Sequence, residues 1–426
     1  MCQHEDAAGQ GHHASPRPSD SFPWHLGVYD AHCHPTDTMA SIERLGGDNG
    51  MRASVLTIMA TRSQDQDLVA QVAAAHGLAG RRLPADGAGC KVVPSFGWHP
   101  WFAHQLYDDT PSSADDAAPP TYSPADDTPA AAIVAKHAHY RAVLQPVPPA
   151  DADAFLDSLP DPAPLSAFIA STRARLAAHP LALVGEMGLD KASRIPEPAS
   201  PSSTTAAVEE GLTPGSREDR RLSPYRVSLS HQRAVLAAQL TLAGRERRAV
   251  SLHGVQAHGV LHDAVSRCWA GWELPSRRER RLVAPHAEEF PGSSEDEEGG
   301  EPPRVTTGGS RSGPLPYPPR ICLHSFSGSA ETLAQWMARG VPARVYASLS
   351  AAVNLSTAAG RARTEEVVRA APDDRLLVES DLHRAGEEMD GLLEHMYRFV
   401  CEVKGWGLEE GVARIRSNYQ AFIFGQ

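Results

Sequence analysis

Eight short apolar runs recur along the chain, and each of them ends in polar or small residues. Most are rich in valine, isoleucine and leucine. Short, nearly continuous apolar runs are typical of strands buried on both faces, as in a parallel sheet. The runs cover residues 26–34, 53–61, 90–100, 181–190, 248–259, 320–328, 343–351 and 375–383.

Helical spacing of apolar residues fills the chain between several of these runs. It predicts helices over 63–75, over 229–243 and around 389–400. Ser63 and Gln66 match a capping box at the start of the first helix. Strand–helix alternation repeated about eight times predicts a closed α/β barrel, a (β/α)8 TIM barrel with helices around a parallel sheet. An open doubly wound sheet is the alternative, but no GxGxxG turn follows the first run.

Three segments interrupt this alternation. Residues 106–161, 192–224 and 275–319 are dominated by proline, serine, alanine and charged residues. Such compositions bury little apolar area, so we expect long disordered loop insertions in the barrel. Removing them leaves roughly the 250 residues usual for one barrel. We therefore expect a disordered tail over residues 1–22 and a single barrel domain over residues 23–426.

Composition narrows the classes of protein that the chain can belong to. The 426 residues are 41% hydrophobic and carry a formal net charge of −12. This charge argues against tight binding of nucleic-acid backbones by lysine and arginine alone, but not against an enzyme that meets phosphates through bound metal. The six cysteines form no CxxC pair and favour no disulfide framework. With neither a secretory signal nor an apolar segment of ~20 residues, the chain is expected to be a soluble protein of the cytoplasm or nucleus.

The motif DAHCH at the end of the first run carries the strongest chemical signal. It places His32 and His34 two residues apart. Residues two apart on a strand point to the same face, so both imidazoles would point into the barrel near the strand's carboxyl end. Two imidazoles there could bind one divalent ion. Two ordinary histidines at a strand end are the alternative, because HxH is a short motif.

Four further predicted strands also carry ligand-type residues at their ends. Glu186 lies within an apolar run, where a glutamate costs several kcal/mol of desolvation unless it is paired or binds a cation. His253, His324 and Asp381 each follow apolar residues, where a barrel strand emerges at its catalytic face. A lone histidine of this kind is more often a hydrogen-bonded core residue. Five strands that each supply such a residue favour a metal site over structural accident.

The motifs DAHCH, SFGWHP, VGEMGLD, LHSFSG and LLVESD, in this order, resemble the TatD family of metal-dependent hydrolases. The resemblance runs from about Tyr29 to Asn418 and is interrupted by the three insertions. It implies an amidohydrolase-type barrel and a deoxyribonuclease or related phosphoesterase that uses two divalent ions. Asn418 and Tyr419 resemble the family's C-terminal signature, where the chain packs back on the barrel.

The resemblance implies a role for each candidate residue. Asp381 and Glu186 would be catalytic, with Asp381 also taking a proton from the attacking water. His99 resembles a family position near the substrate phosphate; a loop histidine between Trp98 and Trp101 is the alternative. Ligand type leaves the ions open among Zn²⁺, Mg²⁺ and Mn²⁺. The implied ligands are His32, His34 and Asp381 for the first ion, Glu186 for both, and His253 and His324 for the second.

Two loops depart from the family's pattern. Residues 253–259 read HGVQAHG where most relatives have an Arg–Asp or similar pair after the histidine, and Leu382 and His383 replace the usual Ser/Ala-Pro. Both changes resemble a fungal subgroup of TatD-like proteins. His258 and His383 could replace the missing contacts to phosphate, or they could be exposed loop histidines.

Three functions are consistent with these residues. Cleavage of phosphodiester bonds in DNA is preferred, because the set of ligands is complete. The altered loops leave a small ester, lactone or amide as an alternative substrate for the same metals. Relatives in the fungal subgroup are described as partners of cell-cycle ubiquitin-ligase machinery, so a barrel acting mainly as a protein-interaction partner is the third hypothesis.

Overall fold

Eight parallel strands form the central sheet of the computed structural model, and each of the eight predicted runs contains one of them. Neighbouring strands follow one another in chain order. The structure describes residues 21–37, 41–42, 45, 51–84, 89–109, 120–198, 221–275 and 313–425. The strands are β1 (Tyr29–Cys33), β2 (Val55–Ala60), β3 (Lys91–Phe96), β7 (Leu183–Asp190), β9 (Val250–Val255), β10 (Arg320–Leu323), β11 (Arg344–Ser350) and β12 (Leu376–Glu379).

Hydrogen bonds join the first strand to the residues that follow the last one. The Asp381 N–H donates to the His32 carbonyl at 3.0 Å, and the His34 N–H donates to the Leu382 carbonyl at 2.7 Å. The buried Asp30 carboxylate accepts the Ser380 N–H at 3.1 Å and the Ser380 hydroxyl at 2.5 Å. The two edges of the sheet therefore meet, which confirms a barrel and excludes the open sheet.

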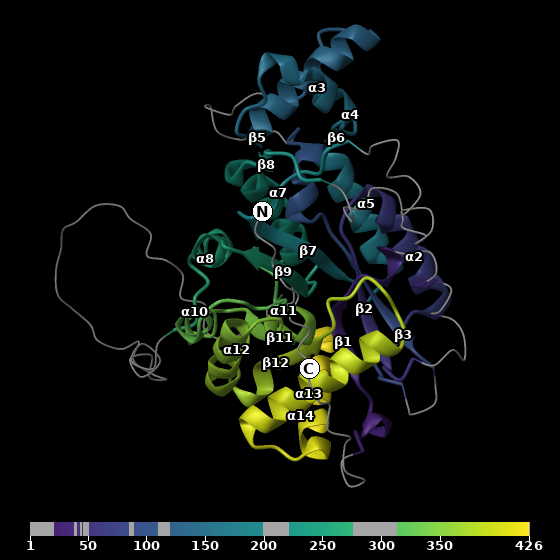
Figure 1. Cartoon of the computed structure of the whole chain (residues 1–426), viewed down its shortest axis with the longest axis vertical. Helices are drawn as coiled ribbons and strands as arrows, with labels where there is room; N and C mark the ends of the chain where they lie inside the picture. Colours follow the sequence, from purple (N-terminus) through teal and green to yellow (C-terminus); the bar gives the residue numbers. More distant parts are fainter. Residues whose placement is uncertain are drawn as a thin grey trace, which may run out of the picture.

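Helices surround the barrel on its outer side (Figure 1). Leu56 and Ile58 of β2 join Val69 and Val72 of the first helix in the main apolar core between strands and helices. Full burial of each such side chain contributes about 1.5–3 kcal/mol. The three predicted helices are confirmed as α2, α7 and α13. The surrounding helices are α2 (Ser63–His76), α5 (Leu165–Ala178), α7 (Leu229–Arg245), α8 (His258–Ser266), α10 (Ala330–Trp336), α11 (Ala351–Asn354), α12 (Ala358–Ala370), α13 (Glu387–Lys404) and α14 (Leu408–Phe424).

The last helix, α14, closes the amino-terminal end of the barrel. The ring of Tyr419 stacks on Tyr29 at the start of β1, with centroids 5.1 Å apart, and Phe422 joins the same buried cluster. Asn418 donates to the carbonyls of Asp373 and Leu376, which ties α14 to the start of β12. The C-terminal segment thus packs back on the barrel as expected, and the opposite end is left for the site.

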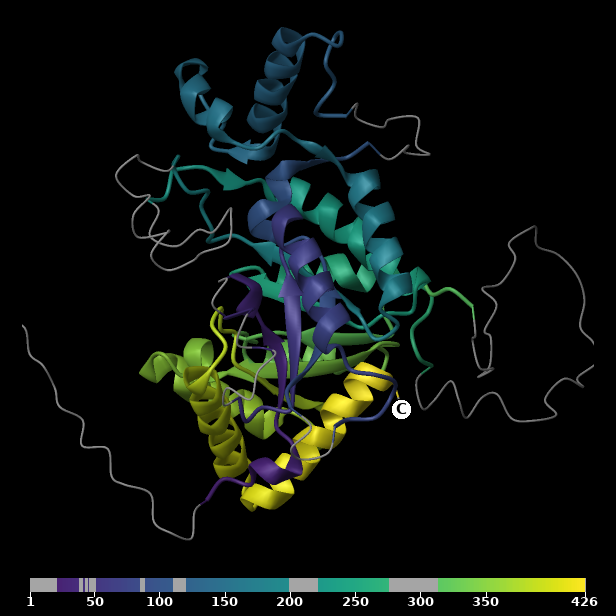
Figure 2. The same ribbon diagram turned by 90° about the vertical axis from the view of Figure 1, so that its right-hand side faces the viewer.

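The insertion between β3 and β7 is not uniformly disordered, which corrects the prediction for residues 106–161. Within it, α3 (Pro129–Val143) and α4 (Asp153–Ser158) form a unit that projects beyond the barrel (Figures 1 and 2). Tyr140 and Leu156 are fully buried there, in an apolar cluster shared with Phe168 of α5. A few well-spaced apolar residues in an alanine- and proline-rich segment are enough to build this cluster. Residues 110–119 lie outside the described residues.

Two smaller expectations are also corrected. Phe22, assigned to the tail, is buried against Trp24 and Tyr397, so the folded domain begins before residue 23. Ser63 and Gln66 do not cap α2: the Asp65 carboxylate accepts the N–H groups of the two residues before the helix. Gln66 instead donates to the Gly97 carbonyl and holds the turn after β3.

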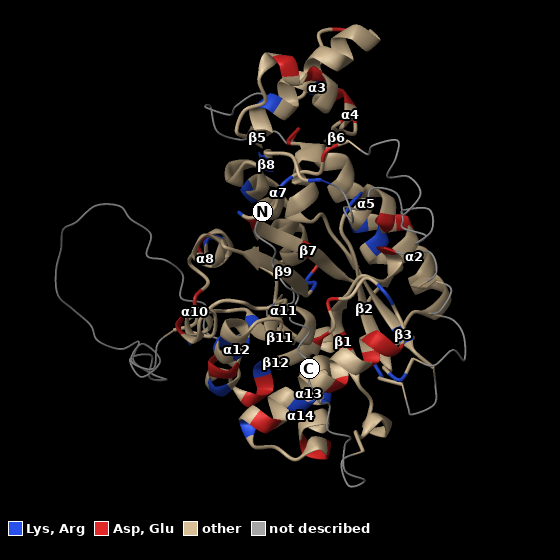
Figure 3. Cartoon of the chain, viewed as in Figure 1, with Lys and Arg blue, Asp and Glu red and all other residues tan. Residues whose placement is uncertain are grey.

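Most charged side chains lie on helices and loops, not on the barrel strands, which short elements connect to the rest of the fold (Figure 3).

Some of the predicted segments lie outside the described residues. These are residues 1–20, 199–220 and 276–312, which hold most of the tail and of the two other predicted insertions. Among the described helices, none is long and apolar enough to cross a membrane. The short elements are η1 (Trp24–Leu26), η2 (Pro35–Asp37), η3 (Pro100–Gln105), β4 (Leu106–Tyr107), β5 (Leu144–Gln145), η4 (Ala150–Ala152), β6 (Ala163–Pro164), β8 (Arg226–Val227), η5 (Arg267–Trp269) and η6 (Asp373–Arg375).

Candidate metal centre

A β-bulge in β1 aims two histidines into the barrel. Between Asp30 and Cys33 the strand holds one residue more than β2 beside it. Ala31 packs in the cluster at the amino-terminal end of the barrel, whereas Cys33 packs outward in the main core. The extra residue therefore resets the side-chain alternation, and His32 and His34 share the inner face as predicted.

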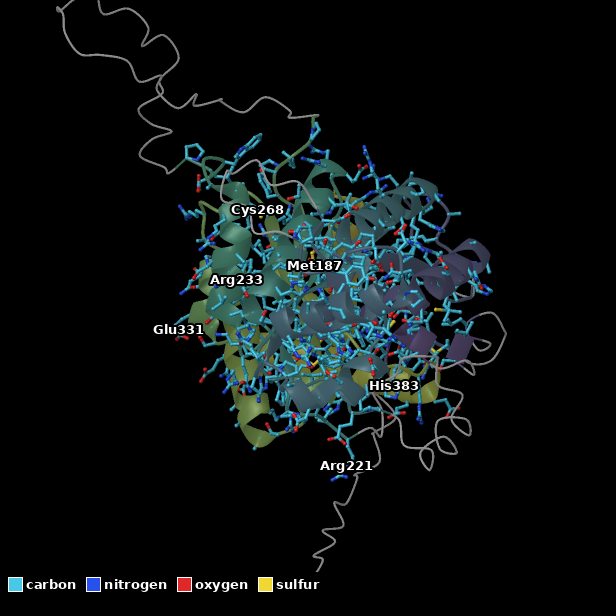
Figure 4. All side chains as sticks on the ribbon, turned by 90° about the horizontal axis from the view of Figure 1, so that it is seen from above. Met187, Arg221, Arg233, Cys268, Glu331 and His383 are labelled. Atoms are coloured by element: carbon cyan, nitrogen blue, oxygen red, sulfur yellow. The ribbon has the colours of Figure 1, made fainter. Side chains whose placement is uncertain are left out.

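A second bulge, in β7, places Glu186 at the centre of the site. The register with β9 shifts between Val184 and Met187. Glycine is required on both sides of the glutamate, because strand β9 comes very close. A Cβ on Gly185 would lie 2.7 Å from the Ser251 carbonyl oxygen, and a Cβ on Gly188 would lie 1.9 Å from that of His253. Seen from above, Met187 beside them lies near the middle of the molecule (Figure 4).

The Oε2 atom of Glu186 faces a first group of donors. It lies 3.4 Å from His32 Nε2 and 3.3 Å from His34 Nε2, and these two nitrogens are 3.1 Å apart. Asp381 Oδ1 lies 3.8 and 3.6 Å from the same nitrogens. A tetrahedral ion with bonds of about 2.1 Å needs donors roughly 3.4 Å apart. The spacings among His32, His34 and Glu186 are therefore close to those of three ligands of one divalent cation, and Asp381 lies slightly farther from the two histidines.

The Oε1 atom of Glu186 faces a second group. It lies 2.7 Å from both His253 Nδ1 and His324 Nε2, and these two nitrogens are 3.0 Å apart. His99 Nε2 is 3.1 Å from the same oxygen. These spacings are those of hydrogen bonds, and a cation would replace the protons between the atoms. The structure thus brings the other five predicted ligands together around the Glu186 carboxylate; the role of all six as ligands stays a prediction.

The histidines and carboxylates of the two groups around Glu186 stabilise one another's charges. Burial raises the pKa of Glu186, but nearby histidines, His99 first, hold it well below its usual range. Burial raises the pKa of Asp381, but its hydrogen bond to His34 and the charges of His324, His32 and His34 together lower this pKa to about 2. Burial lowers the pKa of His34 and His324, yet the carboxylates raise both well above the ordinary value. The carboxylates are therefore ionised at neutral pH, as cation binding requires.

Two carboxylates that the sequence analysis did not single out orient the second group. Asp190 Oδ2 lies 3.1 Å from His253 Nε2, and Glu379 Oε1 lies 3.3 Å from His324 Nδ1. A carboxylate behind a histidine fixes its ring orientation and tautomer, and this arrangement is usual around metals. The signal was present in the sequence, since both acids end apolar runs inside the motifs VGEMGLD and LLVESD.

His99 is held in one tautomer. Its Nδ1 accepts the Trp101 N–H at 3.1 Å, so the ring proton is on Nε2, which points at Glu186. Burial lowers the pKa of His99 to about 3, which keeps the ring neutral. An Nε2–H beside the Glu186 carboxylate is a donor, which suits contact with a substrate oxygen better than binding of a cation.

A cavity of about 580 Å³ opens onto the two groups. His99 and His383 line it, as the prediction of substrate contacts requires. His258 lies behind the wall, with Nε2 3.2 Å from the hydroxyl of Ser327, a lining residue. Arg62 and Trp101 also line the cavity, and the sequence analysis had not proposed either as a site residue.

Comparisons with known proteins agree with this architecture. The chain is similar to Cut9-interacting protein scn1 of Schizosaccharomyces pombe, with 33% identity over 396 residues, 93% of this chain and 98% of that protein. It is also similar to the uncharacterized deoxyribonuclease YMR262W of Saccharomyces cerevisiae, with 24% identity over 409 residues, 93% of this chain and 99% of that protein.

Solved structures resemble the chain at lower sequence identity. An uncharacterized amidohydrolase from Saccharomyces cerevisiae has 14% identity and a TM-score of 0.49, covering 93% of this chain and 99% of its own. YJJV, a TatD homologue from Escherichia coli, has 14% identity and a TM-score of 0.46, with 95% and 99% covered.

The barrel, with histidines and carboxylates gathered at the carboxyl ends of its strands, defines a hydrolase of the α/β-barrel class. Residues 29–424 match the family described as TatD related DNase. The chain belongs to the TatD family, and the resemblance found in the sequence is confirmed.

Proposed function

We propose that the chain is a deoxyribonuclease that hydrolyses phosphodiester bonds with two divalent ions. One observation carries the proposal: the two oxygens of Glu186 face two separate groups of histidines. His32, His34 and Asp381 would hold one ion, His253 and His324 the other, with Glu186 between them. Two ions so placed lower the pKa of water and offset negative charge on a phosphoryl group.

The chain's own side chains supply the rest of the chemistry. Asp381 lies at the cavity wall, is held by the Ser325 hydroxyl at 3.2 Å, and in its ionised form can accept a proton from water. The Nε2–H of His99 can donate to a phosphate oxygen. His383 offers a further contact on the wall. A water would thus be deprotonated on one side of the phosphate while donors hold the other.

Nuclease assays on the purified full chain test the proposal. Single- and double-stranded DNA are incubated with Mg²⁺, Mn²⁺ or Zn²⁺, and product formation is compared between wild type and Glu186→Gln. We expect a loss larger than the 10–100-fold typical for residues behind the ligands. Glu331→Gln, an exposed glutamate at the edge of the molecule (Figure 4), is the matched control. No activity with any metal, or full activity of Glu186→Gln, contradicts the proposal.

A second candidate keeps the metals and changes the bond to a small ester, lactone or amide. It is supported by the position of His258 behind the cavity wall, since of the two histidines expected to contact phosphate from the altered loops only His383 lines the cavity. A substrate panel in which a small ester turns over much faster than any nucleotide favours this candidate.

A third candidate is a protein-interaction role, as the name of the scn1 relative suggests for that protein. Ile133 and Val134 on α3 are 50% and 68% exposed, on the unit that projects from the barrel. We propose this unit as the contact for a Cut9-like partner in the cytoplasm or nucleus. Loss of such binding in an Ile133→Asp, Val134→Asp double variant that keeps its hydrolase activity supports this role; unchanged binding contradicts it.

A further inference from the structure

A separate cavity lies at the amino-terminal end of the barrel, opposite the candidate metal centre. It measures about 660 Å³, which is a usual size for a small-molecule site. Its wall is formed by the turn after α2, by the starts of β3 and β10, and by the chain at the ends of α5, α7 and α14. Among the described residues, it shares no lining residue with the cavity over the metal centre.

Positive side chains dominate the wall of this cavity. It carries four arginines and, among its described residues, one acidic side chain, that of Glu246. Glu246 is already paired with Arg173, whose Nε lies 2.8 Å from its carboxylate. The cavity is therefore strongly positive, although the chain as a whole has a net charge of −12. The four arginines are Arg81, Arg247, Arg248 and Arg320.

Backbone carbonyls hold three of these guanidinium groups. Arg81 and Arg320 donate to the last carbonyls of α14, and Arg248 donates to the Leu176 carbonyl of α5 at 2.7 Å. In the described part of the chain, the hydrogen-bond partners of these three arginines are thus uncharged. A guanidinium has five N–H donors. The carbonyls accept from one nitrogen of Arg81 and from two nitrogens of each of the others, so donors remain for an anion.

The four arginines are also close enough to repel one another. The pKa of Arg320 falls to about 10, first because the group is partly buried and further because Arg81, Arg247 and Arg248 place positive charge near it, while Tyr346 acts in the opposite direction. Partly buried charges are costly when no counterion balances them. An anion bound between the arginines would offset this repulsion, so their arrangement favours anion binding.

We infer that this cavity binds a small molecule that carries a diphosphate group. Guanidinium groups match phosphate oxygens in both charge and geometry, because two parallel N–H groups can donate to one phosphate. Two phosphate groups carry about three to four negative charges at neutral pH, which is comparable to the charge of four arginines and one glutamate. Free pyrophosphate and a nucleoside diphosphate share this chemistry. The inference is independent of the proposed nuclease function, because the cavity contains none of the candidate metal ligands.

A structural role for the arginines is the alternative, because positive charge at the carboxyl-terminal ends of α5 and α14 is favourable by itself. Glu246→Gln separates the two roles. It removes the negative charge from the wall and should therefore strengthen the binding of an anion. Capping of the two helices alone predicts no such gain.

Calorimetric titration of the full chain with sodium pyrophosphate, at fixed ionic strength and without added divalent metal, tests the inference. We expect one binding step in the wild type, weakened about tenfold in Arg81→Gln and in Arg248→Gln and strengthened about two- to fivefold in Glu246→Gln. Arg369→Gln, an exposed arginine of α12 that does not line the cavity, is the matched control and should bind as the wild type does. A parallel titration with ADP distinguishes the two sources: tighter binding of ADP indicates a nucleotide, and equal or weaker binding indicates free diphosphate.

Several outcomes overturn the inference. They are no binding of either compound, competition by sulfate as strong as that of pyrophosphate at the same ionic strength, and affinity unchanged by both arginine substitutions. Binding that is lost in Glu186→Gln but retained in the arginine variants would place the anion at the metal centre and also overturn it. The melting temperature of each variant shows whether the fold is retained; if an arginine variant unfolds, the result with Glu246→Gln decides. The titration requires no hydrolysis, so this inference and the nuclease function can fail separately.

Discussion

Asp190 provides a sharp test of the metal centre, because it touches the second ligand group and not the first. Its Oδ2 accepts from His253 Nε2 at 3.1 Å and from Trp101 Nε1 at 2.5 Å. Its Oδ1 accepts the N–H groups of Ala192 and Ser193 at 2.7 and 2.8 Å. Burial raises the pKa of Asp190, but these hydrogen bonds, that of His253 first, lower it below its ordinary value.

Replacing Asp190 with asparagine turns one of the two acceptor oxygens into an NH₂ group, which cannot accept. Either the ring donors or the two backbone N–H groups then lose their partner. Substitution of a carboxylate behind a metal-binding histidine typically lowers metal affinity 10–100-fold, which corresponds to about 1.4–2.7 kcal/mol. We expect this loss at the site of His253 and His324 alone, since the hydrogen bonds of Asp190 within the described residues go to His253, Trp101, Gln232, Ala192 and Ser193, and not to His32 or His34.

Calorimetric titration of the metal-free chain with Zn²⁺ at fixed pH measures the two affinities separately. Asp109→Asn is the matched control, because that half-buried carboxylate accepts comparable hydrogen bonds from Ser166 and does not line the cavity. Two unchanged binding steps in Asp190→Asn would refute the reasoning. So would an equal weakening of both steps, because it would indicate a general loss of structure.

Three further predictions follow from the fold. Gly188→Ala should lower the free energy of unfolding, measured in urea, by about 1–3 kcal/mol, because the new Cβ would lie 1.9 Å from the His253 carbonyl oxygen. Gly259→Ala is the control and should leave this free energy unchanged, since the space around Gly259 is open. His139 is buried, donates to the His104 carbonyl, and burial lowers its pKa to about 4. Protonation of His139 therefore favours the unfolded chain. The contribution of the neutral side chain to the free energy of unfolding is complete above pH 6.5 and is lost as pH falls from 6.5 toward 4, up to about 3 kcal/mol. A weaker pH dependence of unfolding is expected for His139→Gln. Zn²⁺ at 100 times its dissociation constant should raise the free energy of unfolding by about 2.7 kcal/mol, and a chelator should reverse the gain.

The barrel could be predicted from the sequence because its signals are local. A parallel strand covered on both faces needs an apolar run, and each of the eight runs contains a strand. The candidate ligands could be proposed for the same reason, because polar residues buried at the ends of such runs are costly unless they are paired or bind a cation. His32 and His34 share a face because they lie two residues apart, although the bulge in β1 decides that this face is the inner one.

The bulges and the first insertion could not be predicted, because they depend on contacts far apart in the sequence. The extra residue in β1 is visible only against the register of β2, and the sequence contains no mark for it. The α3–α4 unit is stabilised by Tyr140 and Leu156 packing with Phe168 of α5, and composition averaged over the segment conceals these residues. The predicted cap of α2 was wrong, because Asp65 and not Ser63 accepts the backbone N–H groups of Thr61 and Arg62 just before the helix.

The candidate metal centre and the cavity in front of it thus have different structural origins in this chain. The predicted ligands lie at strand ends, and the carboxylates that orient them end the same or neighbouring strands, so local pattern fixes both. The outer wall of the cavity comes instead from η3 after β3 and, in a smaller adjoining cavity, from residues after α4 and β7. Trp101 connects the two regions through Asp190, since Asp190 accepts from Trp101 Nε1 and lies behind His253. We therefore expect changes in the insertion to leave the candidate metal centre unchanged, whereas loss of the Trp101 indole N–H removes one of the hydrogen bonds that hold Asp190.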